Sequence, residues 1–98
     1  MPASKDVKNP KGEVTKFSQL LYANAKSDTT VKNAALYKEV YSSLRKTVIP
    51  ECMCATQMIH IIKTSRGNAM KKLGTSKLTL KEKAFWDQIF ITLQNLFW

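Results

Sequence analysis

The sequence predicts an all-α fold of four helices in a single small domain. Apolar residues recur every three to four positions in four successive segments, which is the period of a helix that buries one face. Clusters of polar residues, glycine and proline separate these segments and mark their ends. The chain of 98 residues is 44% hydrophobic and 23% charged, a composition typical of a globular domain with a modest core.

Residues 1–12 are expected to form a flexible basic arm ahead of a helical domain that covers residues 13–98. The arm contains three lysines and almost no apolar side chain, and terminal segments of this kind are usually mobile unless something holds them. Its lysines are within reach of a polyanion, but ordinary solvated charges explain them equally well. The arm ends at Pro10 and Gly12.

The first two helices are predicted over residues 13–25 and from about residue 28 to Val48. Between them a polar cluster breaks the apolar period, and Asp28, Thr29 and Thr30 can each cap the second helix. The apolar stripes are Val14, Phe17, Leu20, Leu21 and Ala25 in the first helix, and Leu36, Tyr37, Val40, Leu44 and Val48 in the second.

The third helix is predicted to start at Pro50 and to run without a break to Leu73. Proline suits the first turn of a helix because it has no amide proton to donate. Gly67 weakens this prediction, since a glycine inside a helix costs about 1 kcal/mol relative to alanine. The alternative is two shorter helices joined by a turn at residues 65–68. In either case Gly74 is the natural C-terminal cap.

A fourth helix is predicted from Thr79 to the end of the chain. Thr79 and Glu82 have the spacing of a capping box, in which each side chain bonds a backbone amide at the helix start. The helix is more apolar than a monomer of this size needs, and five of the nine aromatic residues lie between positions 85 and 98. The surplus apolar surface predicts a homodimer, or contact with another protein, through Phe85, Trp86, Phe90, Phe97 and Trp98.

Positive charge is concentrated between Lys63 and Lys83. This stretch holds seven of the sixteen lysine and arginine residues and a single acid, so it carries +6 of the formal net charge of +9. A localised basic surface on a small domain is the usual mark of a protein that binds a polyanion, with nucleic acid the first class to consider. The candidate contacts are Lys63, Arg66, Gly67, Lys71, Lys72, Lys77, Lys81 and Lys83, with Lys38 and Arg45 as second-line contacts.

The expected mode of binding is sequence-independent contact with the phosphate backbone of a duplex, either RNA or DNA. Lysine outnumbers arginine fourteen to two, and lysine is a point charge that suits phosphate contact better than the reading of base edges. The basic stretch contains no aromatic residue, so stacking on single strands is not favoured. Double-stranded RNA is preferred over DNA because it is recognised by shape and by phosphate and sugar contacts.

An adaptor is the alternative function: a small helical subunit whose aromatic C-terminal helix and basic patch dock on an acidic protein. Small basic helical proteins of viruses and of ribonucleoprotein assemblies fall in both classes. The positions of Phe90, Phe97 and Trp98 separate the two functions. Burial of these side chains against a second copy supports the nucleic-acid binder, and their exposure in the isolated protein supports the adaptor.

Catalysis, cofactors and metal ions are not expected. The chain has one histidine, His60, and no phosphate-binding loop, nucleophile elbow or zinc-ligand spacing. Cys52 and Cys54 are too few for a closed zinc site even with His60, so both are interpreted as apolar packing residues. No apolar run approaches the roughly 18 residues of a membrane-spanning helix, and the first residues lack the apolar core of a signal peptide. The protein is therefore expected in the cytoplasm or nucleus.

Overall fold

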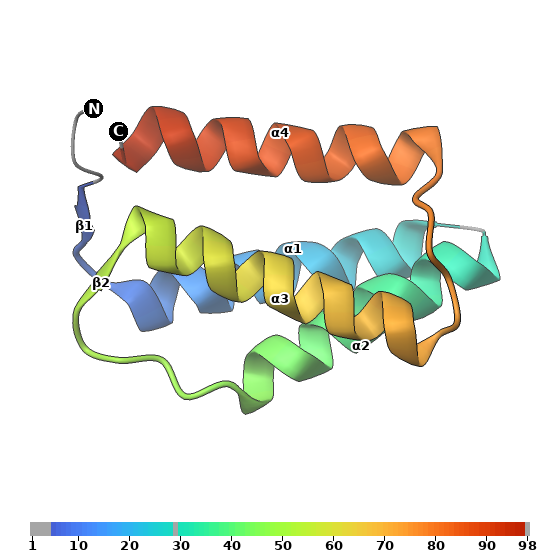
Figure 1. Ribbon diagram of the computed structural model, residues 1–98, viewed down its shortest axis with the longest axis horizontal. Helices are drawn as coiled ribbons and strands as arrows, with labels where there is room; N and C mark the ends of the chain where they lie inside the picture. Colours follow the sequence, from blue (N-terminus) through green and yellow to red (C-terminus); the bar gives the residue numbers. More distant parts are fainter. Residues whose placement is uncertain (1–4, 29, 98) are drawn as a thin grey trace.

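Four helices make up most of the chain that the structure describes (Figure 1). This computed structural model describes residues 5–28 and 30–97, with side chains up to Asn95, and the described residues are 76% helical. The prediction of an all-α fold with four helices is confirmed. The helices are α1 (Pro10–Ser27), α2 (Val31–Lys46), α3 (Ala55–Lys72) and α4 (Leu80–Phe97).

The helices form an elongated bundle of 38 × 26 × 23 Å. Helices α1 and α2 form an antiparallel pair, α3 lies across it, and α4 runs along the side of the bundle away from α2 (Figure 1). The α1–α2 turn and the α3–α4 connection lie at the same end, drawn at the right of the figure. The N-terminal segment lies at the opposite end.

Two short strands tie the N-terminal segment to the bundle. Strand β1 (Asp6–Val7) pairs antiparallel with β2 (Met53–Cys54), so that Val7 lies opposite Met53 and both side chains are buried. The structure therefore differs from the flexible arm predicted for residues 1–12, because Val7 has an apolar partner far along the chain. No local pattern reveals such a contact. Residues 1–4 of the predicted arm lie outside the described residues.

Helix α1 begins earlier and α2 ends earlier than predicted. Asn9 caps α1, because its side-chain Oδ1 accepts a hydrogen bond from the Gly12 amide at 3.2 Å. Helix α2 ends at Lys46 and leaves Val48 90% exposed, so the prediction that Val48 belongs to the buried stripe is wrong. The other four predicted core residues of α2 are buried: Leu36, Tyr37, Val40 and Leu44.

Helix α3 starts at Ala55 instead of Pro50, because residues 53 and 54 are used by β2. Cys54 caps this helix: its sulfur accepts the Gln57 amide, and its own amide donates to Gln57 Oε1 at 3.0 Å. The helix then continues through Gly67 to Lys72. The prediction of one unbroken helix is confirmed for this segment, and the two-helix alternative is wrong.

Gly74 closes α3 in the predicted way. Its φ of +70° lies in the left-handed region that favours glycine. The Gly74 amide donates to Lys71 O at 3.1 Å, and the Thr75 amide donates to Met70 O at 3.0 Å. These two bonds define a Schellman motif, which satisfies the last carbonyls of the helix.

Trp86 of α4 lies in the middle of the hydrophobic core and is 0% exposed. Its ring centroid lies 5.4 Å from that of Phe85, 5.9 Å from Phe17 of α1 and 6.4 Å from Tyr37 of α2. Trp86 therefore anchors α4 to the helical hairpin. This corrects the expectation that Trp86 belongs to an interface with a partner, because the side chain is fully enclosed by its own chain.

The remaining aromatic residues of the predicted interface divide into two groups. Phe85 and Phe90 are half-buried and pack against the core around Trp86. The side chains of Phe97 and Trp98 lie outside the part of the chain that the structure describes.

Tyr37 makes the stability of the fold sensitive to alkaline pH. Burial, followed by the Glu82 and Asp28 carboxylates, raises the pKa of Tyr37 to about 12, whereas an unfolded tyrosine has a pKa of about 10. The protonated Tyr37 side chain therefore contributes fully to the free energy of unfolding below about pH 10, and this contribution is lost as the pH rises towards about 12. We expect Tyr37→Phe to lose less stability than the wild type over this range. Urea unfolding midpoints from about pH 9 to 11.5 test this, and parallel curves for the two proteins would contradict it.

Candidate nucleic-acid interface

Four helix ends meet at the end of the bundle that holds the α3–α4 connection (Figure 1). They are the last turns of α1 and α3 and the first turns of α2 and α4. All the lysines on these turns, and the one in the connection, are exposed. We call this surface the basic end, and it comprises Lys26, Lys32, Lys71, Lys72, Lys77, Lys81 and Lys83.

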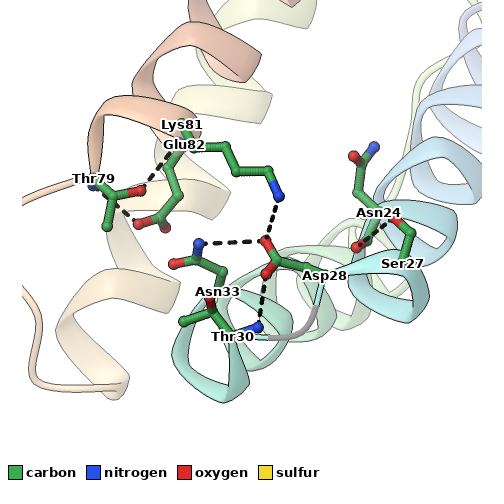
Figure 2. A network of polar contacts seen from close by, with 8 residues as sticks. All are labelled: Asn24, Ser27, Asp28, Thr30, Asn33, Thr79, Lys81 and Glu82. Carbon is green, nitrogen blue, oxygen red and sulfur yellow. Dashed lines mark hydrogen bonds and ion pairs between the residues drawn. The ribbon is translucent and has the colours of Figure 1, made fainter.

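Glu82, the single acid of the basic stretch, is used inside the protein (Figure 2). Its Oε1 accepts the Thr79 amide at 3.0 Å, and its own amide donates to Thr79 Oγ1 at 3.2 Å. The predicted capping box is therefore confirmed. Because Glu82 is 4% exposed, its carboxylate is turned away from the surface on which the lysines lie.

Asp28, at the end of α1, is held in the same network (Figure 2). One carboxylate oxygen accepts the Thr30 amide at 2.8 Å, and the other accepts Asn33 Nδ2 at 3.3 Å and faces Lys81 Nζ at 3.7 Å. The backbone hydrogen bond from Thr30, with Asn33 and Lys81, lowers the pKa of the Asp28 carboxyl. Thr30 makes no side-chain cap bond to α2, so Asp28 orders this turn through the Thr30 amide.

One further carboxylate reaches the basic end from the side of α2. Glu39 pairs with Lys72 at 3.2 Å. Exposed ion pairs of this kind contribute about 0–1 kcal/mol, so Lys72 can turn towards another anion at small cost. The Asp28 side chain is only 4% exposed, but it keeps its hydrogen bonds to Thr30 and Asn33 when the exposed Lys81 ammonium group turns away. Among the described residues, Lys32, Lys71, Lys77 and Lys83 make no ion pair or ring contact. The basic end therefore presents positive charge that its own carboxylates leave largely uncompensated.

Lys63 and Arg66 lie on the side of α3 that faces α4. The Arg66 guanidinium carbon is 5.4 Å from the Trp86 ring centroid and 5.5 Å from that of Phe90, and Lys63 Nζ is 5.2 Å from Phe90. Burial lowers the pKa of Arg66, and Asp87 acts in the opposite direction. Arg66 is half-buried and Lys63 is exposed. Arg66 thus takes part in packing α4, which leaves Lys63 more accessible to a ligand.

Gly67 lies in open space on α3. A Cβ atom added there has nothing within 4 Å, and the residue has ordinary helical geometry. The fold itself therefore does not require glycine at this position.

Replacement of Gly67 by alanine is expected to raise the free energy of unfolding by up to about 1 kcal/mol, because alanine is the better helix former. Thermal unfolding measures this. Gly74→Ala is the matched control and is expected to destabilise, since its φ of +70° strains any side chain. Destabilisation of both variants would show that Gly67 has a structural role absent from this account.

Lys38 and Arg45 lie apart from the basic end. Arg45 is in the last turn of α2, towards the opposite end of the bundle (Figure 1). Its Nη1 donates a hydrogen bond to Tyr41 Oη at 3.0 Å, and its guanidinium lies over the same ring. Lys38 is exposed on the same helix. The residues predicted as one site therefore fall into three groups: those of the basic end, Lys63 and Arg66 on the side of α3 that faces α4, and Lys38 and Arg45 on α2.

Lys26 and Lys32 also belong to the basic end, although they were not among the predicted contacts. They precede and follow the α1–α2 turn, far in sequence from residues 63–83. The turn itself was predicted, but its position beside the start of α4, where Asp28 lies 3.7 Å from Lys81, brings together distant parts of the chain. The sequence carries no local signal for that contact.

The cysteines occupy different environments. Cys52 is exposed, which corrects its interpretation as a packing residue. Within residues 5–28 and 30–97, no group of three or more histidine, cysteine and acidic residues can hold a metal ion. Over the same part of the chain, no helix is long and apolar enough to cross a membrane.

Comparisons of the chain with protein-family models, curated proteins and solved structures find no match. The basic end is therefore interpreted from its own residues and geometry.

Proposed function

We propose that this protein binds the phosphate backbone of duplex nucleic acid through its basic end, without sequence preference, and that double-stranded RNA is the preferred duplex. The observation that supports the proposal is the charge balance of this surface. Six exposed lysines from four helix ends and one from the α3–α4 connection lie together, and the neighbouring carboxylates are held by a helix cap, a turn or an ion pair.

Counterion release supplies the free energy of such an interaction. Each lysine that neutralises a phosphate releases condensed cations, so the affinity falls with salt at a logarithmic slope of about −0.9 per contact on B-form DNA. Simultaneous contact by the four lysines that make neither an ion pair nor a ring contact gives a slope of about −3.6. Recruitment of Lys72 and Lys81 steepens it to about −5.4.

The proposed preference for double-stranded RNA is based on how the charges of the basic end are distributed. Its charges come from the ends of four helices and from a connection, whereas readers of the DNA major groove insert one helix along its length. A surface of separate point charges suits contacts to phosphates across a shallow groove, which is how double-stranded RNA is recognised.

The test is a titration of labelled double-stranded RNA, double-stranded DNA and single-stranded RNA of equal length, at about 50 and 200 mM salt. We expect tightest binding to double-stranded RNA, weaker binding to double-stranded DNA, and a strong loss of both at the higher salt. Absence of binding to either duplex at low salt would rule out the proposed function.

A second candidate, the adaptor that binds another protein, is favoured by one observation. A groove of about 400 Å³ between α1, α3 and α4 is lined mainly by apolar side chains, including Phe17, Leu20 and Leu93. Leu20, on the α1 side of this groove, is 45% exposed. A helix of a protein partner, or of a second copy in a homodimer, can pack on this surface. Light scattering during gel filtration tests the homodimer, and a monomeric mass at micromolar concentration would contradict it.

A further inference from the structure

Two tyrosines from different helices lie side by side on the outer surface of the α1–α2 hairpin. The ring centroids of Tyr22 and Tyr41 are 5.5 Å apart, and the ring planes are inclined by 37°. Tyr22 is 43% exposed and Tyr41 is half-buried. Aromatic rings that reach solvent in pairs are the usual platform on which unpaired nucleobases stack.

A positively charged side chain lies over each of these two rings. Lys26 Nζ lies 4.6 Å from the Tyr22 ring centroid, and the Arg45 guanidinium carbon lies 5.6 Å from that of Tyr41. The hydrogen bond from Arg45 to Tyr41 Oη holds that guanidinium in place. The surface is therefore a row of cation, ring, ring and cation that spans both helices.

A hollow of about 420 Å³ opens beside Tyr41 and Arg45, between α1 and α2. This volume lies within the usual range of small-ligand sites. Polar side chains of α1 and of the residue that follows α2 line it, including Lys11, Gln19 and Thr47. Hydrogen-bonding groups therefore surround the space next to the ring of Tyr41.

No acidic side chain of α1 or α2 opposes an anion on this surface. The single acid of α1, Glu13, pairs with Lys16 at 3.7 Å, and that of α2, Glu39, pairs with Lys72 of α3 at 3.2 Å. Glu13 lines the apolar groove on another side of α1. Lys38, one turn before Tyr41, is exposed and adds to the positive charge of the surface.

We propose that this face binds unpaired nucleotides of a single strand. Bases stack on Tyr22 and Tyr41, and Lys26 and Arg45 contact the flanking phosphates. The inference goes beyond the proposed duplex contact and does not rest on it, because the tyrosines lie outside the basic end. Lys26 belongs to both surfaces, so a strand that leaves a duplex at the basic end has a direct path onto the tyrosine pair.

The relative strengths of the interactions allow a base to displace Lys26 from Tyr22. An exposed cation–π contact corresponds to a factor of roughly 2 to 5 in an equilibrium constant. Stacking of a base on an aromatic side chain changes the binding constant by a factor of roughly 5 to 150. The displaced ammonium group can then reach a phosphate of the same nucleotide, since its stem is long and flexible.

The test compares a labelled oligothymidylate with an abasic strand of the same length. The two strands carry the same phosphates, so any difference in affinity comes from the bases. Fluorescence anisotropy is expected to show at least about 5-fold tighter binding of the strand with bases. Tyr22→Leu and Tyr41→Leu are expected to remove that difference, while Tyr22→Phe and Tyr41→Phe, which keep the rings, are expected to preserve it. Because Tyr22 is more exposed than Tyr41, its leucine variant reports on binding even if Tyr41→Leu disturbs the hairpin.

Equal affinity of the wild type for the two strands, or no binding of either strand, would overturn the inference. Retention of the full difference in Tyr22→Leu, with an unchanged circular dichroism spectrum, would also overturn it. Failure of the duplex proposal gives a different pattern. In that case duplexes do not bind, while the strand with bases still binds more tightly than the abasic strand.

Discussion

Simultaneous replacement of Lys71, Lys77 and Lys83 by glutamate is expected to weaken binding to double-stranded RNA by about 500-fold at 0.1 M salt. At this salt concentration each phosphate contact contributes about 0.9 of a decade in affinity, so the loss of three contacts removes about 2.7 decades. The logarithmic salt slope is expected to become shallower by about 3. Within the described structure these lysines make no ion pair, so the fold should tolerate the change.

The matched control reverses three exposed lysines of the N-terminal segment and the first turn of α1, at the other end of the bundle: Lys5, Lys8 and Lys11. Both triple variants lower the formal net charge from +9 to +3. The control is expected to weaken duplex binding by less than about 10-fold, through long-range electrostatics alone. Equal losses in the two variants would show that total charge, and not the basic end, determines binding.

Replacement of Trp86 by alanine is expected to lower the free energy of unfolding by about 3–5 kcal/mol. Trp86 is 0% exposed and contacts rings from α1, α2 and α4 as well as Arg66 of α3. A domain of this size has a total stability of roughly 5–15 kcal/mol, so the variant loses a large part of it. Urea unfolding followed by circular dichroism provides the measurement.

Two control variants on α4 refine this prediction. Ile91→Ala is expected to change the stability by less than about 0.5 kcal/mol, because Ile91 is 49% exposed. Trp86→Phe is expected to lose less than Trp86→Ala, since it keeps a ring. It also removes the indole Nε1–H, which is buried without a hydrogen-bond partner in the described structure. A small effect of Trp86→Ala would show that other contacts hold α4 on the bundle.

The parts of the fold that the sequence predicted best are those specified by local chemistry. The capping box of Thr79 and Glu82 and the cap at Gly74 depend on residues within one helical turn, and both form as expected. The start of α3 depends instead on the pairing of Val7 with Met53, which joins distant parts of the chain. Pro50 is a good local start signal, but this tertiary pairing overrides it.

The candidate site was predicted in part for the same reason. The charge between residues 63 and 83 is visible in the sequence, because these lysines are close along the chain. The tyrosine pair is not, since Tyr22 and Tyr41 approach only when α1 packs on α2. For Trp86 the sequence predicted an interface that the structure does not show. The many aromatic residues between positions 85 and 98 predict surplus apolar surface, whereas the Trp86 side chain packs in the core among the helices.

The most direct test of the central claim is an NMR titration of isotope-labelled protein with a short RNA duplex. If the duplex binds at the basic end, the amide signals that shift most belong to the last turn of α3, residues 73–79 and the first turn of α4. The α1–α2 turn should shift with them, because Asp28 links it to Lys81. Shifts confined to the apolar groove between α1, α3 and α4, with the basic end unchanged, would contradict the account.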